Sequence, residues 1–190
     1  MPEHLKNATK DCTLEVSAEY PTPNRLRLSY RVHNRAARPI YLFNRLYTDI
    51  LPGKVFAVDP QLAHIRQARH QVVVSKAIVP VPDGLEVEYR YVPCMSKLLP
   101  NETFEESFDL ALPVSPLSAY TPWLLRADPV ASELLFKIGY FVAAPEAENL
   151  VREVATPAGP AYRIDPFPLA SQQLLSVGPF AKKIAVFTTK

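Results

Sequence analysis

The sequence predicts an all-β fold, an antiparallel sandwich of about nine to eleven short strands joined by proline-rich loops. Two observations carry this prediction. The 190 residues include 20 prolines and 5 glycines, and proline costs about 3 kcal/mol inside a helix and is kept out of central strand positions. Most stretches between the prolines alternate apolar and polar residues with a period of two, the pattern of a half-buried strand.

The first two predicted strands, Thr13–Tyr20 and Arg25–His33, alternate strictly and are separated by a turn with two prolines. This arrangement indicates a hairpin or a connection between two sheets. Pro39–Tyr47 follows and is apolar on both faces, which is typical of a strand in the middle of a sheet.

Five further strands are predicted between residues 54 and 112. Glu106 interrupts the apolar face of Thr103–Leu112, which predicts a bulge or an edge position in that strand. The predicted strands are Lys54–Val58, Leu62–Arg66, His70–Lys76, Glu86–Val92 and Thr103–Leu112.

Residues 112–130 hold four prolines and the single tryptophan, so they are expected to form a long extended connection. Strand character resumes in Glu133–Ala143. Residues 145–164 fit either a helix that begins at Pro145 or a hairpin, and the β surroundings favour the hairpin. Ser171–Val177 and Lys182–Thr188 are the last predicted strands.

The length and the regular punctuation favour a single sandwich domain over residues 1–190. Its outline resembles immunoglobulin-like and fibronectin-like sandwiches at the level of architecture. The Cys…Trp…Cys framework of immunoglobulin domains is absent, since Trp123 follows both Cys12 and Cys94. Such an architecture hosts many activities and therefore implies no function.

Composition excludes several classes of protein. The formal net charge of +2 gives no basic field for nucleic acid, and no apolar run is long enough to span a membrane. The first residues do not form a secretory signal, so a cytoplasmic location is expected, with Cys12 and Cys94 as thiols. No spacing of Cys or His completes a metal site.

No catalytic or cofactor motif is recognisable, and we expect neither an enzyme nor a bound cofactor. The five glycines are isolated and cannot form a phosphate loop. Cys94 has no evident base beside it and is interpreted as a buried, inert thiol. The least implausible catalytic group is His64 and His70 with Asp59.

A basic stripe is the first candidate binding feature. Six arginines and no acid occur between residues 25 and 45, and one strand should direct four basic side chains to the same face: Arg25, Arg27, Arg31 and His33. Guanidinium groups bind carboxylates and phosphates through paired donors. The alternative is a solvated face on which Glu105 and Asp109 of a neighbouring strand neutralise the arginines.

Tyr120 and Trp123 form the second candidate, within the proline-rich connection. Exposed aromatic rings there could stack on sugars or anchor a partner, whereas buried ones would close the end of the core. Together these features predict a non-enzymatic binding or adaptor domain for another protein, either one with an acidic surface or a second copy of the chain. The alternative is a carbohydrate-binding module that uses the two aromatic residues.

Overall fold

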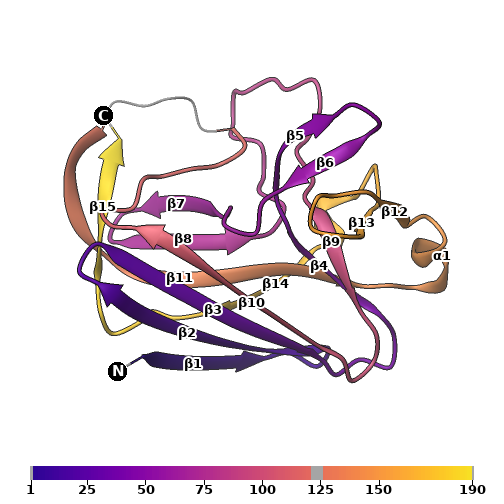
Figure 1. The fold of residues 1–190 in the computed structure, drawn as a ribbon, viewed down its shortest axis with the longest axis horizontal. Coiled ribbons are helices and arrows are strands. Elements are labelled where there is room, and N and C mark those ends of the chain that lie inside the picture. Colours follow the sequence, from indigo (N-terminus) through magenta and orange to yellow (C-terminus); the bar gives the residue numbers. More distant parts are fainter. Residues whose placement is uncertain (1, 121–125, 190) are drawn as a thin grey trace.

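The computed structural model describes residues 2–120 and 126–189 (Figure 1). Within them the chain forms fifteen strands, the short helix α1 (Pro145–Glu148) and one 3-10 turn, Leu169–Ser171. The predicted all-β class is therefore confirmed. No helix in the described ranges is long and apolar enough to cross a bilayer.

Four strands form a fully antiparallel sheet in the order β1-β2-β3-β10. β2 and β3 form a hairpin, which is one of the two arrangements that the sequence predicted. β1 and β10 are the edges of this sheet. The strands are β1 (Glu3–Ala8), β2 (Cys12–Thr22), β3 (Arg25–Asn34) and β10 (Thr103–Ala111).

The larger sheet runs β12-β13-β9-β4-β11-β8-β7, and β14 and β15 also pair with β11. Its β8–β11 pair is parallel, which departs from the predicted antiparallel arrangement. The chain leaves β8, visits both sheets through β9 and β10, and returns as β11 in the same direction (Figure 1). The strands are β4 (Ile40–Arg45), β7 (His64–Ala68), β8 (Gln71–Lys76), β9 (Cys94–Leu98), β11 (Arg126–Val142), β12 (Arg152–Val154), β13 (Ala161–Arg163), β14 (Gln173–Val177) and β15 (Ile184–Thr189).

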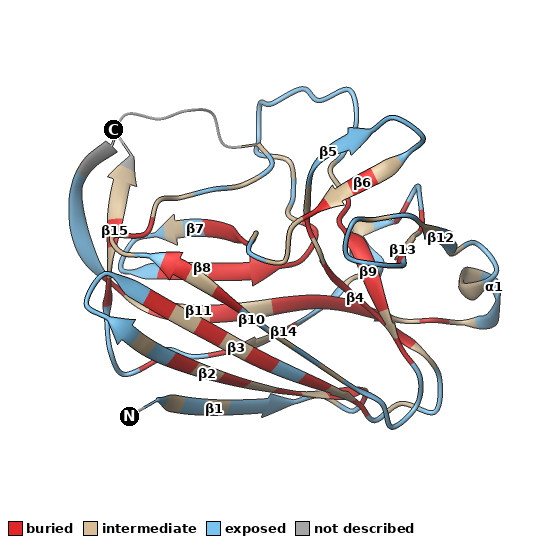
Figure 2. Cartoon of the chain, in the orientation of Figure 1, coloured by how far each residue is buried: buried red, intermediate tan, exposed pale blue. Residues whose placement is uncertain are grey.

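The main apolar core lies between the two sheets. Inward-facing residues of β2, β3 and β10 pack against β8 and β11, and Figure 2 shows the alternating buried positions along β2 and β3. A second cluster around Phe43, Phe141 and Phe167 fills the end near α1. Each large side chain buried in this way contributes about 1.5–3 kcal/mol.

Several predicted elements are wrong or incomplete. Glu86–Val92 alternates like a strand but pairs with no neighbour, and most of its residues are exposed in a loop. The predicted strand Lys54–Val58 is confirmed as β6 (Val55–Val58), but its hairpin partner β5 (Tyr47–Leu51) was not predicted, and neither were β1 and β9. Residues 145–164 form both alternatives in succession, the helix α1 and then the hairpin of β12 and β13.

A close approach at Gly139 of β11 explains why a side chain is absent there. The Gln172 side chain bridges the main chain of Ile78, accepting from its N–H at 2.8 Å and donating to its carbonyl at 3.1 Å. A Cβ at Gly139 would lie 2.2 Å from Gln172 Oε1 and 2.9 Å from Ala77 Cβ.

Gly139→Ala should therefore lower the free energy of unfolding by about 1–3 kcal/mol, because the added methyl displaces the amide from its bridge. Urea unfolding followed by circular dichroism measures the loss. The double variant Gly139→Ala/Gln172→Ala removes the closer of the two contacts and should lose less than the sum of the two single variants. Strict additivity would contradict the assigned contact.

Candidate binding face

The outer face of the four-stranded sheet carries polar side chains in rows that cross the strands. The register pairs Ser17 of β2 with Ser29 of β3, and Ser29 with Ser107 of β10. We call these three residues the serine row. His4 of β1 stands opposite Ser17 and extends the row to the other edge of the sheet.

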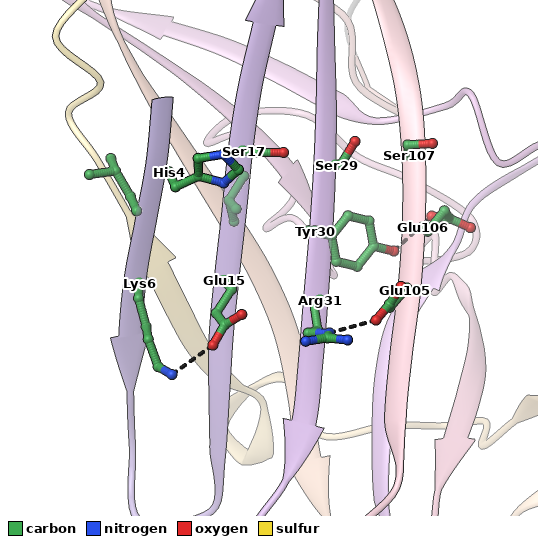
Figure 3. A pocket seen from close by; sticks show the side chains of 12 residues that line it. His4, Lys6, Glu15, Ser17, Ser29, Tyr30, Arg31, Glu105, Glu106 and Ser107 are labelled. Atoms are coloured by element: carbon green, nitrogen blue, oxygen red, sulfur yellow. Dashed lines mark hydrogen bonds and ion pairs between the residues drawn. The ribbon is translucent and has the colours of Figure 1, made fainter. Parts of the chain in front are cut away.

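A charged row of alternating sign runs beside the serine row. It crosses the sheet from Lys6 to Glu15, Arg31 and Glu105. Lys6 donates to Glu15 at 2.6 Å and Arg31 donates to Glu105 at 2.5 Å (Figure 3). The hydrogen bond from Lys6 lowers the pKa of Glu15.

A second charged row lies on the other side of the serine row and contains Glu19, Arg27 and Asp109. Serine side chains are much shorter than the charged ones beside them, and a hollow lies over the serine row and the first charged row. The hollow has a volume of about 660 Å³, is open to solvent and is lined by all four strands (Figure 3).

Carboxylates of β10 neutralise most of the predicted basic stripe. Arg25 and Arg27 both donate to Asp109, with Arg27 Nε 2.9 Å from Oδ1, and Arg31 is paired with Glu105. The hydrogen bond from Arg27 is the main reason that the pKa of Asp109 is lowered. Glu105 and Asp109 are the two acids that were predicted as partners of the arginines, and the acidic and basic side chains share one face of the sheet.

His33 also lies on this face, with its Nδ1 3.0 Å from the Thr103 hydroxyl. The four basic residues of the stripe are therefore brought together as expected. Their positive charge is balanced rather than displayed, because acids of β10 stand beside three of them.

Directly beneath the face, a buried ion pair joins the two sheets. Lys76 at the end of β8 is 0% exposed, and its Nζ lies 2.6 Å from Oε2 of Glu106 on β10. Lys76 also donates to the carbonyl of Pro60 at 2.7 Å, and Tyr30 donates to the same Glu106 oxygen at 2.7 Å. Burial lowers the pKa of Lys76, and the Glu106 carboxylate opposes that shift.

The polar network extends from this pair to β4 and β9 of the larger sheet. Asn44 donates to the Tyr30 hydroxyl at 3.2 Å and accepts from the Ser96 N–H at 3.2 Å. Arg45 donates to the Ser96 hydroxyl at 3.0 Å, and its Nη1 lies 4.0 Å from Glu106. The network satisfies polar groups that would otherwise be costly inside the core.

Glu106 was predicted as a break in an apolar face, but its pairing with Lys76 was not predicted. The available signal was Lys76, a lysine that ends the apolar run of β8. A cation and an acid that both interrupt core-facing patterns are candidates for a buried pair.

The aromatic candidate is only partly described. Tyr120 is half-buried, and its hydroxyl accepts from the Tyr91 N–H at 2.8 Å, which ties the proline-rich connection to the loop before β9. Trp123 lies outside the described residues.

The remaining reactive groups do not assemble into a site. Cys12 and Cys94 are free and buried, and burial raises the pKa of both thiols, so little thiolate is present. His64 is buried at the start of β7, whereas His70 is exposed in the β7–β8 turn. No metal-binding cluster of His, Cys, Asp and Glu occurs within residues 2–120 and 126–189.

Comparisons with known proteins add no assignment: the chain matches no family model, and neither the curated proteins nor the solved structures contain a significant match.

Proposed function

We propose that this chain is a non-enzymatic binding domain that attaches to another protein through the outer face of its four-stranded sheet. The observation that supports this is the open hollow over the serine row, bordered by the ion-paired row of Lys6, Glu15, Arg31 and Glu105. In this proposal the two facing sheets form an immunoglobulin-like sandwich that serves as the scaffold.

The shape and chemistry of the hollow favour a protein surface over a small molecule. Small-molecule sites are concave, mostly apolar and enclose most of the ligand. This hollow is open rather than enclosing, and its lining mixes apolar atoms with serine hydroxyls and paired charges. Serine hydroxyls both donate and accept hydrogen bonds, which suits the mixed donors and acceptors of a polar protein surface.

The balanced charges modify the expected partner. An acidic surface would have to displace Asp109 and Glu105 from their arginines, whereas a surface of mixed charge can pair with both signs at once. We therefore propose a partner surface that is polar and of alternating charge. Such complementarity sets specificity and association rate more than affinity.

The proposal is tested by placing the photo-reactive residue p-benzoylphenylalanine at Ser29 and irradiating cells of the native host. A discrete crosslinked species is expected from this position. The same residue at Glu153, exposed on β12 of the other sheet, is the matched control and should not give that species. Equal labelling from both positions, or none from Ser29, would contradict the proposal.

A charge swap separates recognition from stability. Arg31→Glu/Glu105→Arg keeps one ion pair with its polarity reversed but sets a second carboxylate opposite Glu15, so the free energy of unfolding should fall by no more than about 1 kcal/mol. Crosslinking from Ser29 should fall about ten-fold, because like charges then face the partner. If crosslinking from Ser29 falls in Arg31→Glu but returns to the parent level in the double swap, the partner does not recognise the charges of this row.

A further inference from the structure

The edge of β10 that borders the outer face has main-chain groups with no strand beside them. Hydrogen bonds at both ends of β10 fix which residues face β3. The Leu112 N–H donates to Asn24, and the Asn34 N–H donates to the Glu102 carbonyl, so the even-numbered residues face β3. Glu105 and Ser107 therefore direct their N–H and C=O groups away from the sheet.

Other edge strands are shorter. On β1 the Ala8 N–H donates to the Asn7 side chain at 2.8 Å, and the outward-facing N–H groups that remain are those of His4 and Lys6, a shorter stretch than on β10. Ile65 of β7 exchanges two main-chain hydrogen bonds with Leu117.

The same holds for the smaller strands. The Tyr47 N–H of β5 donates to the Tyr91 hydroxyl, and that hydroxyl donates to the Tyr47 carbonyl. Residue Ala155, which follows β12, accepts from the Phe56 N–H at 3.0 Å.

β10 is protected at one end only. The Gln61 side chain accepts from the Asp109 N–H at 2.9 Å and covers only that end of the strand. Thr103–Ser107 lie beyond this cap, and within the described chain no hydrogen bond reaches the N–H of Glu105 or Ser107. Proteins usually shorten or cover their edges, so an uncovered stretch of this length indicates a place where another strand pairs.

We propose that Thr103–Ser107 of β10 binds an extended segment of the partner protein that has a lysine or arginine opposite Glu105 and an apolar residue on either side. This inference rests on the proposed function and specifies how part of the partner is recognised. Antiparallel pairing would place the basic side chain on the outer face, beside the carboxylate of Glu105.

The two flanking positions of the partner segment would point toward the core side. They would lie opposite Phe104 and Glu106 of β10. Phe104 is half-buried, with the Arg45 guanidinium 5.5 Å from the centre of its ring, so an apolar neighbour would cover its remaining exposed surface. Glu106 already pairs with Lys76, and its side chain is 9% exposed, so it does not repel that neighbour.

Charge also decides against a second copy of the chain as the occupant. The open stretch is centred on Glu105, so symmetrical antiparallel pairing would set Glu105 against the same residue of the copy. Like charges directly opposite destabilise a strand pair, whereas a basic residue in that position stabilises it.

The test uses the purified protein, labelled with ¹⁵N, and a blocked peptide of sequence Thr-Val-Lys-Val-Thr at millimolar concentration. The peptide should shift the amide signals of Glu105 and Ser107 and slow their hydrogen exchange. A peptide with glutamate at the centre should bind about five-fold more weakly.

Two variants make the result specific to this edge. Ser107→Pro removes an N–H that does not bond to β3, so it should abolish peptide binding and keep the fold. Gln67→Pro removes an N–H on the edge of β7, because the main-chain groups of Gln67 face away from β8 as those of Ile65 do. This control variant should leave peptide binding unchanged. Glu105→Lys should reverse the preference toward the glutamate peptide, which tests the proposal even if Ser107→Pro does not fold.

Several outcomes would overturn the proposal. One is a set of amide shifts confined to another strand edge, and a second is equal affinity for the lysine and glutamate peptides. A third is a dimer, detected by sedimentation without peptide, in which the amides of Glu105 and Ser107 are already protected from exchange. Because this experiment uses only the purified chain, its failure leaves the crosslinking result at Ser29 intact. Failure of that crosslink would conversely leave the strand pairing standing.

Discussion

Replacing Lys76 with methionine should lower the free energy of unfolding by about 3–5 kcal/mol. The substitution keeps the length and apolar stem of the side chain but leaves the carboxylate of Glu106 in the core without its cation. The Pro60 carbonyl also loses its donor. Such a loss is a large part of the 5–15 kcal/mol that stabilises a typical domain, so guanidinium unfolding should detect it readily.

The double variant Lys76→Met/Glu106→Gln is the control for this prediction. It removes both charges while the glutamine oxygen still accepts from Tyr30, so most of the lost stability should return. A buried pair often contributes little relative to an uncharged replacement, and only its disruption is costly. A loss below about 1 kcal/mol for Lys76→Met would contradict the burial and pairing of this lysine.

Lowering the pH from 7 to 4 should destabilise the protein through His64. This side chain is 4% exposed, its Nε2 has no hydrogen-bond partner among the described residues, and the Tyr91 ring packs edge-on against it at 5.7 Å. Burial lowers the pKa of His64 to about 4, from an ordinary value of 6.5.

The direction of the effect follows from which state binds the proton. Below pH 6.5 the imidazole is protonated in the unfolded chain, while the folded chain keeps it neutral until about pH 4. Stability is therefore fully present above pH 6.5 and is lost as the pH falls through this window. The loss attributable to His64 should approach about 3 kcal/mol.

Urea unfolding at a series of pH values for His64→Gln measures this contribution. The variant should show a shallower fall in stability between pH 6.5 and 4 than the parent chain. His70→Gln, which changes an exposed histidine in the adjoining turn, should leave the slope as it is. Parallel curves for the parent chain and His64→Gln would show that His64 is not buried in the neutral form.

The elements that the sequence predicted best are those whose alternation continues over many residues. β2, β3 and the second half of β11 have long apolar faces that meet a single core, so periodicity alone locates them. The first residues of β11, 126–130, were wrongly assigned to the extended connection, because their strand character comes from pairing with β15. The segment 86–92 has the same periodicity, yet it lies in a loop because no strand is available to pair with it. β1 has little apolar character, and its position follows from its pairing with β2, which lies beyond the reach of a local pattern.

The candidate face was predicted in part for a similar reason. Strict alternation in β3 placed four basic residues on one side, and the charges of β10 suggested their partners. Which strands are neighbours depends on long-range pairing, so the serine row and its hollow could not be derived. The buried pair of Lys76 and Glu106 joins residues 30 positions apart on different sheets, and no local pattern links them.

The pairing of β11 has a consequence for how the chain folds during synthesis. β4, β8, β14 and β15 all hydrogen-bond to this one strand. The β2–β3 hairpin is local and can form as soon as it leaves the ribosome, but β4 and β8 have no shared neighbour until residues 126–142 have emerged. For much of translation the growing chain therefore exposes apolar strands without their partner, and this is the interval in which chaperones would protect it from aggregation.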